Sequence, residues 1–383
     1  MQPTPRPRPR TRTTVLLVVL AVVVGAVGGW TARLPAAAAW RSATSAVGQQ
    51  SAAATGSTPS AQRPSAALHT VPPSPKPVDA DAAGGDVIPA AEAPAGKPVV
   101  DALDLASTWE APADLPLHGR LLHVVIPATR SHFTARSALV YLPPAALTAA
   151  PPALPVAVLL SGQSRGAGPE DVETGGQISV TLDHLAALHG GLAPIVVVPD
   201  QLGPESANPM CVDGRLGNSR TYLTEDVPAW VESHLTVQHA ASRWTIGGFS
   251  QGGTCAIQLG AGDPDRFGSL VDVSGELGPT LGTPAKTIAE GFAGDAAAWR
   301  AAQPAALLAA HTPYRASSAF FAPGQDDHSY GPVMPGTAQR ARAAGMTVAT
   351  WVVPGARHSW ATARVAFAAA FSWLQPRTGL APA

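Results

Sequence analysis

The chain has 383 residues, of which 46% are hydrophobic, so it can bury a sizeable core and is not disordered throughout. Its 25 basic and 26 acidic residues nearly cancel, which argues against nucleic-acid binding because phosphate recognition needs a basic face. Two cysteines are too few for a disulfide scaffold or a Cys-rich zinc module. We expect neither a metal nor another cofactor.

The first 40 residues have the pattern of an export segment. Arginines alternate with other residues up to Arg12, and no charge follows until Arg33. The uncharged stretch reaches the roughly 20 residues that a bilayer requires, and the alanines at 36–39 offer a cleavage site. Residues 1–40 are therefore predicted to be a signal anchor or a signal peptide, with a slight preference for the anchor. Both place the remainder outside the cytoplasm, secreted or held at the plasma membrane.

Residues 41–100 are rich in Ala, Pro and Ser and nearly free of aromatic residues. Such a segment cannot bury enough apolar surface to offset the entropy lost on ordering. It is predicted to be a disordered tether between the export segment and a folded domain.

From residue 101 the pattern changes to short apolar runs that alternate with helix-like stretches. Continuous apolar runs are typical of strands buried on both faces of a parallel sheet. The predicted strands are Leu121–Ile126, Ala138–Leu142, Val156–Leu160, Ile195–Val198, Trp244–Ile246, Leu270–Val273, Ala319–Ala322 and Val348–Val353. The predicted helices are Val180–His189, Leu223–His234, Gly253–Leu259, Thr337–Ala344 and Ala361–Trp373.

This alternation predicts a single α/β domain over residues 101–376, followed by a tail at 377–383. The first two strands form a hairpin-like start, and the others belong to right-handed βαβ units. We expect a mostly parallel central sheet with helices covering both faces. Pro228 is unfavourable inside the second helix unless that helix begins there.

The sequence Gly248-Phe-Ser250-Gln-Gly252-Gly follows one of these strands and precedes a helix. This is the context of a nucleophile elbow, a strained turn that exposes a serine above the sheet edge. The two glycines flank the turn where a Cβ would collide with neighbouring backbone. Ser250 is therefore predicted to be a catalytic nucleophile, with the N–H of Gln251 directed at a developing oxyanion.

A serine nucleophile needs a base and a carboxylate, which in this architecture follow in the order Ser, acid, His. His358 lies just after the last strand and is the predicted base. The acid should follow the preceding strand, where Asp326 and Asp327 are adjacent. We favour Asp327 and keep Asp326 as the alternative. Together with His328 the two aspartates could imitate a metal cluster, but no partner ligands stand at zinc spacing, so no metal is expected there.

A second oxyanion donor should come from the loop that follows the strand Val156–Leu160. Gln163 is the natural donor through its backbone N–H, because Gly162 before it allows a close approach.

Three blocks, Gly248–Gly253, Thr221–Trp230 and Gly355–Trp360, resemble the esterase D-type "putative esterase" family of α/β-hydrolases. Within that family the chain is similar to the secreted mycolyltransferases of the mycobacterial antigen complex and their exported relatives. The resemblance covers most of 101–376 and implies that Ser250 is the nucleophile, His358 the base, and Gln163 and Gln251 the oxyanion amides. Those transferases use a glutamate as the acid and a long apolar groove, neither of which is found in this sequence.

Cys211 lies in a loop rich in Pro, Asn and Gly, and Cys255 lies five residues after Ser250. In an oxidising compartment a disulfide would clip this loop to the catalytic helix, and we favour the bridge over two free thiols.

These observations predict an exported or membrane-anchored serine esterase that hydrolyses carboxylic esters through an acyl-enzyme. One alternative is a mycolyltransferase-like acyltransferase that moves an acyl group from a lipid or other ester to a sugar hydroxyl. Another is a non-catalytic cell-wall binding domain built on a hydrolase scaffold. The expected partners are an ester or lipid substrate, a possible sugar acceptor, and the membrane through the N-terminal segment.

Overall fold

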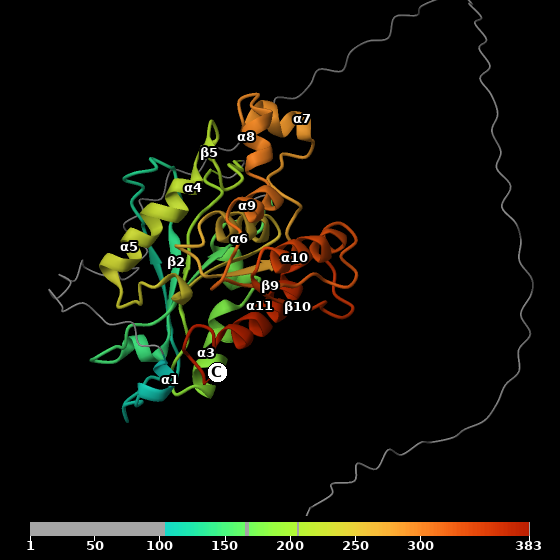
Figure 1. Ribbon diagram of the computed structural model, residues 1–383. Helices are drawn as coiled ribbons and strands as arrows, with labels where there is room; N and C mark the ends of the chain where they lie inside the picture. Colours follow the sequence, from blue (N-terminus) through green and yellow to red (C-terminus); the bar gives the residue numbers. More distant parts are fainter. Residues whose placement is uncertain (1–103, 165–167, 205–206, 383) are drawn as a thin grey trace, which may run out of the picture. The chain divides into compact units, whose positions relative to one another are not determined.

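The computed structural model describes residues 104–382 except 165–167 and 205–206 (Figure 1). The predictions of an export segment at 1–40 and of a tether at 41–100 lie outside the described residues. In the described part of the chain, no helix combines the length and the apolar character that a membrane span requires.

An eight-stranded sheet forms the centre of the domain, and all its strands except the first two pair in parallel with at least one neighbour. The pairs β1–β2 and β2–β4 are antiparallel and the remaining pairs are parallel, so the predicted mostly parallel α/β sheet is confirmed. In spatial order the strands are β1 (Arg120–Val124), β2 (Ala138–Leu142), β4 (Ile195–Val198), β3 (Val156–Leu160), β7 (Trp244–Phe249), β8 (Ser269–Val273), β9 (Ser318–Phe321) and β10 (Thr347–Thr350).

Helices follow most of the strands, and a two-stranded ribbon and several short turns lie in the loops. The helices are α1 (Leu105–Thr108), α2 (Glu170–Thr174), α3 (Ile178–Leu188), α4 (Ser219–Thr221), α5 (Val227–His234), α6 (Gln251–Gly262), α7 (Pro284–Lys286), α8 (Ala296–Ala301), α9 (Pro304–Ala310), α10 (Met334–Ala343) and α11 (Trp360–Leu374). The ribbon pairs β5 (Asp213–Gly214) with β6 (Gly217–Asn218).

The sheet is buried on both faces because successive side chains of its strands enter two different apolar clusters. In β3, Val156, Val158 and Leu160 join the cluster that contains residues of α5, α6 and α10. Ala157 and Leu159 point to the other face, where they join residues of α3 and α11. Figure 1 shows α3 and α11 next to each other. Helices therefore cover both faces, and this explains the continuous apolar runs of the sequence.

Pro228 is tolerated because α5 begins at Val227, which places the proline in the first turn. Its missing N–H thus falls at the junction between α5 and the turn before it, outside the regular hydrogen-bond pattern of α5. A π-helical turn, η2 (Tyr222–Asp226), continues the helix backwards from that point. The predicted helix over 223–234 is thus one α-helix preceded by a wider turn.

The last residues, for which the sequence predicts a tail, pack on the domain. Leu380 is buried and belongs to the cluster under α5 and α6. The Leu105 N–H donates to the Gly379 carbonyl at 2.8 Å, so the beginning and the end of the described domain are hydrogen-bonded to each other.

Candidate active site

Ser250 occupies the turn between β7 and α6, at the carboxyl edge of the parallel strands. Its backbone has φ 58° and ψ −120°, a strained conformation for a residue with a side chain. The Ser250 N–H donates to the Val273 carbonyl at 2.9 Å, and the Ser250 carbonyl accepts from the Thr254 N–H at 3.0 Å. These backbone bonds on both sides hold the strained turn, and Ser250 is half-buried in it.

The flanking glycines are required by contacts with backbone atoms. A Cβ on Gly252 would lie 2.2 Å from the Leu160 carbonyl oxygen of β3. A Cβ on Gly248 would lie 2.3 Å from the carbonyl carbon of Gly252. These approaches let the strand, turn and helix pack so closely that the serine stands above the sheet edge.

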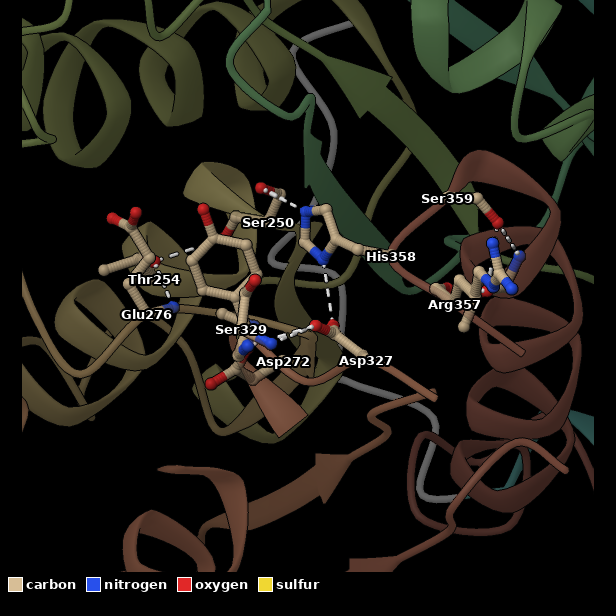
Figure 2. Close-up of polar contacts among 12 residues, drawn as sticks. Ser250, Thr254, Asp272, Glu276, Asp327, Ser329, Arg357, His358 and Ser359 are labelled. Atoms are coloured by element: carbon tan, nitrogen blue, oxygen red, sulfur yellow. Dashed lines mark hydrogen bonds and ion pairs between the residues drawn. The ribbon is translucent and has the colours of Figure 1, made fainter. Parts of the chain in front are cut away.

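His358 reaches Ser250 from the loop between β10 and α11. Its Nε2 lies 2.9 Å from the Ser250 Oγ, and its Nδ1 lies 2.9 Å from the Asp327 Oδ2. Figure 2 shows the imidazole between the hydroxyl and the carboxylate. The ring packs against Phe249, with centroids 4.7 Å apart, and Tyr330, with centroids 4.4 Å apart. Two aromatic neighbours therefore restrict its orientation.

Asp327 follows β9 and is buried, whereas the alternative acid Asp326 is exposed. Burial opposes ionisation of Asp327, but hydrogen bonds from the Tyr330 N–H and from His358 outweigh it and lower the pKa of this carboxyl. The structure therefore places Asp327, the favoured candidate, beside His358. An ionised carboxylate there accepts the Nδ1–H and leaves Nε2 free to accept a proton from serine.

Gln251 and Gln163, the predicted oxyanion donors, lie beside the serine on α6 and on the loop after β3. Gln251 is the first residue of α6, directly after Ser250. Gln163 follows Gly162, where a Cβ would lie 3.3 Å from the Cβ of Ser250. The loop after β3 thus passes against the nucleophile, as a second oxyanion donor requires.

A disulfide joins Cys211 to Cys255 and connects the loop before β5 to α6. Met210 and Cys211 both have positive φ, so the loop is tightly bent where the bridge attaches. Within the described residues, no cluster of His, Cys, Asp and Glu is arranged to hold a metal ion.

Several residues near Ser250 were not predicted from the sequence. Asn208 and Gln201 contact the side chains of Gln163 and Gln251, and Tyr330 covers one face of His358. Glu276 lies in the loop after β8, where burial raises its pKa to about 7. Its N–H donates to the Thr254 hydroxyl at 2.8 Å, as drawn in Figure 2. No local motif marks these residues, because separate loops bring them together.

The sheet order, the elbow and the order Ser, Asp, His define the class, which is that of the serine hydrolases with an α/β-hydrolase fold. The Putative esterase family model matches residues 133–374, and the chain belongs to this family. The family resemblance of the three sequence blocks is thereby confirmed.

The chain is also similar to other proteins. An uncharacterized protein of Corynebacterium glutamicum is 37% identical over 272 residues, covering 68% of this chain and 63% of the relative's own length. A ferulic acid esterase structure matches with a TM-score of 0.57 at 18% identity, covering 70% of this chain and 100% of that one. The S-formylglutathione hydrolase of Agrobacterium tumefaciens matches with a TM-score of 0.55 at 20% identity, covering 69% and 97% of the two chains. At these identities the two structures show a common fold.

Proposed function

We propose that this protein is an exported serine esterase that hydrolyses carboxylic esters through an acyl-enzyme. The observation that carries the proposal is the pair of 2.9 Å contacts that link the Ser250 hydroxyl to His358 and His358 to the buried Asp327. An incidental serine in a glycine turn would not need an imidazole at its hydroxyl and a carboxylate behind that imidazole. Membership of the esterase family supports the same chemistry.

In the proposed reaction Ser250 attacks the ester carbonyl while His358 Nε2 takes the hydroxyl proton. The negative charge on the carbonyl oxygen is stabilised by the backbone N–H groups of Gln163 and Gln251. The protonated imidazole gives its proton to the departing alcohol, and Asp327 stabilises the imidazolium meanwhile. Water, activated by the same histidine, then releases the acid from the acyl-serine.

The disulfide supports the export part of the proposal. Disulfides persist in oxidising compartments and are rare in the cytosol of most organisms. Cys211–Cys255 therefore agrees with the extracytoplasmic location predicted from residues 1–40.

The test is a series of p-nitrophenyl esters of increasing acyl length, with a fluorophosphonate label as a measure of serine reactivity. We expect the full chain to hydrolyse the esters and to be labelled at Ser250. Ser250→Ala should lower kcat by about 10⁵-fold or more and abolish labelling while the melting temperature stays unchanged. Near-normal turnover by the alanine variant would refute the serine mechanism. Repeating the assay with a sugar acceptor and quantifying acylated sugar against free acid separates hydrolysis from transfer.

A further inference from the structure

The side-chain amides of Gln201, Gln251 and Asn208 form a chain of hydrogen bonds beside the nucleophile. Gln201 Nε2 donates to the Gln251 Oε1 at 3.1 Å, and Gln251 Nε2 donates to the Asn208 Oδ1 at 3.2 Å. Asn208 Nδ2 then donates to the Gln163 Oε1 at 2.7 Å. The first three side chains are buried, so water does not compete for these bonds.

Main-chain groups fix the orientations of the Gln201 and Asn208 amides, and with them the direction of these hydrogen bonds. Gln201 Nε2 also donates to the Ser161 carbonyl at 2.7 Å, and a carbonyl can only accept. Asn208 Oδ1 also accepts from the Met210 N–H at 3.0 Å, and an N–H can only donate. The orientation of the Gln251 amide between them follows. If any one of the three amides were reversed, two donors or two acceptors would face each other.

This series of hydrogen bonds starts and ends in the same loop and so forms a ring. It begins at Ser161 and ends at Gln163, which belong to the same loop after β3. On the way it passes through Gln251 of α6 and through Asn208 of the loop that carries Cys211. The Gln251 Nε2 also lies 3.2 Å from the Cys255 Sγ, so the disulfide is part of the same arrangement. We call Ser161, Gln201, Gln251, Asn208 and Gln163 the amide ring.

We infer that Asn208 and Gln201 are positioning residues for the oxyanion hole, because the amide ring fixes the two residues that donate to the oxyanion relative to each other. The inference rests on the proposed function of Gln163 and Gln251. Their side chains do not touch substrate in this role. They anchor the backbone segments whose N–H groups must lie within about 3 Å of the developing charge, and a small displacement of such a donor is costly.

Asn208→Ala removes the ring bonds to Gln251 and to Gln163, and Gln163→Ala removes only the second of these while keeping the Gln163 N–H. We expect each variant to lower kcat by about 10- to 100-fold, less than the loss of a whole oxyanion donor, with KM changed less than about threefold. The double variant should be no slower than Asn208→Ala, because Asn208→Ala already removes the bond that Gln163→Ala breaks.

Gln258→Ala is the matched control. Gln258 is buried in α6 and donates from Nε2 to the Met210 carbonyl at 3.2 Å, so it holds the same loop through a bond outside the amide ring. We expect it to lower the melting temperature as much as Asn208→Ala does but to leave kcat within about threefold. The inference would be overturned if Asn208→Ala had the same kcat as Gln258→Ala. It would also be overturned if the kcat losses of Asn208→Ala and Gln163→Ala multiplied in the double variant.

Hydrogen exchange supplies a readout that needs no substrate. Asn208→Ala should speed exchange in the peptide that contains residues 160–164, whereas Gln258→Ala should leave it at the wild-type rate. Equal exchange in both variants would also overturn the inference. A wild-type protein that is inert toward esters and fluorophosphonate would refute the proposed function, and the exchange result would still decide whether Asn208 holds this loop.

Discussion

Ser250 has two differently built sides. On the acid–base side stand His358, Asp327 and Tyr330, on loops after β9 and β10, where a charge and its hydrogen bonds define the geometry. On the amide side stand the amide ring and the disulfide, which join the loop after β3 to α6 through neutral groups and one covalent bond.

The difference teaches which conditions each side responds to. The acid–base side contains groups that gain and lose protons, so pH acts on it. The amide side contains no titrating group in its ring, but it includes a bond that a reductant can break. A change of pH and a reductant should therefore act on different sides. Each should lower turnover through one side and leave the geometry of the other unchanged.

After loss of the nucleophile itself, the largest effect is expected from the acid. Asp327→Asn should lower kcat by about 10⁴-fold, because the imidazole loses the partner that fixes its tautomer and stabilises its charged form. Asp326→Asn, one residue away and exposed, should stay within about threefold of wild type. Steady-state kinetics on a p-nitrophenyl ester measures both variants. The reverse ranking would assign the acid to Asp326.

Gly252→Ala tests how tightly the turn that carries Ser250, which both sides share, is packed. The new Cβ would meet the Leu160 carbonyl oxygen, and displacing β3 backbone should cost about 3 kcal/mol in the free energy of unfolding. Because Leu160 precedes the loop that bears Gln163, turnover should fall as well. Gly336→Ala, in α10 with only the tip of Arg340 nearby, is the control and should not destabilise. Denaturant unfolding that gives equal stabilities for the two variants would show that the elbow can relax.

Breaking the disulfide should affect the amide side alone. The bridge spans 44 residues, and losing it should cost at most about 4 kcal/mol in the chain-entropy model. Reductant and Cys211→Ser should both lower the melting temperature, and both should lower kcat because Gln251 contacts Cys255. The variant should not respond to further reductant. Two titratable thiols in unfolded, unreduced protein would show instead that the bridge is absent.

The smallest effect concerns Glu276, whose pKa is raised by burial from 4.5 to about 7. The folded state then holds this proton more tightly than the unfolded state does, so ionisation destabilises the wild type as pH rises from about 4.5 through about 7. Glu276→Gln cannot ionise. Its melting temperature should therefore rise relative to wild type over that interval and keep a constant difference above it. A difference that is the same at pH 4 and pH 8 would contradict this assignment.

The acid–base side was largely predictable from the sequence. Strands buried on both faces leave continuous apolar runs, and each of the residues Ser250, Asp327 and His358 lies just after one such run. The parallel sheet brings the carboxyl ends of those strands to one edge, so chain position alone places these residues together. The choice between Asp326 and Asp327 needed the structure, because one residue of register decides which carboxylate turns inward.

The amide side was predictable only in outline. Gln163 and Gln251 follow from their positions beside a strand end and an elbow, but Asn208 and Gln201 lie in an irregular loop without periodicity. Their role depends on side-chain contacts across more than 40 positions of sequence, which no local pattern encodes. Helices α8 and α9 were missed for a related reason, since their alanine-rich sequence gives little contrast between an apolar and a polar face.

The bond between the Leu105 N–H and the Gly379 carbonyl has a topological consequence. The described domain starts and finishes with its two ends side by side, so a short linker could join them and new ends could be opened in a surface loop. Such a circular permutant would keep all eight strands in their order. The exposed loop around Gly282, whose Cβ position has no neighbour within 4 Å, is a suitable place to open the chain.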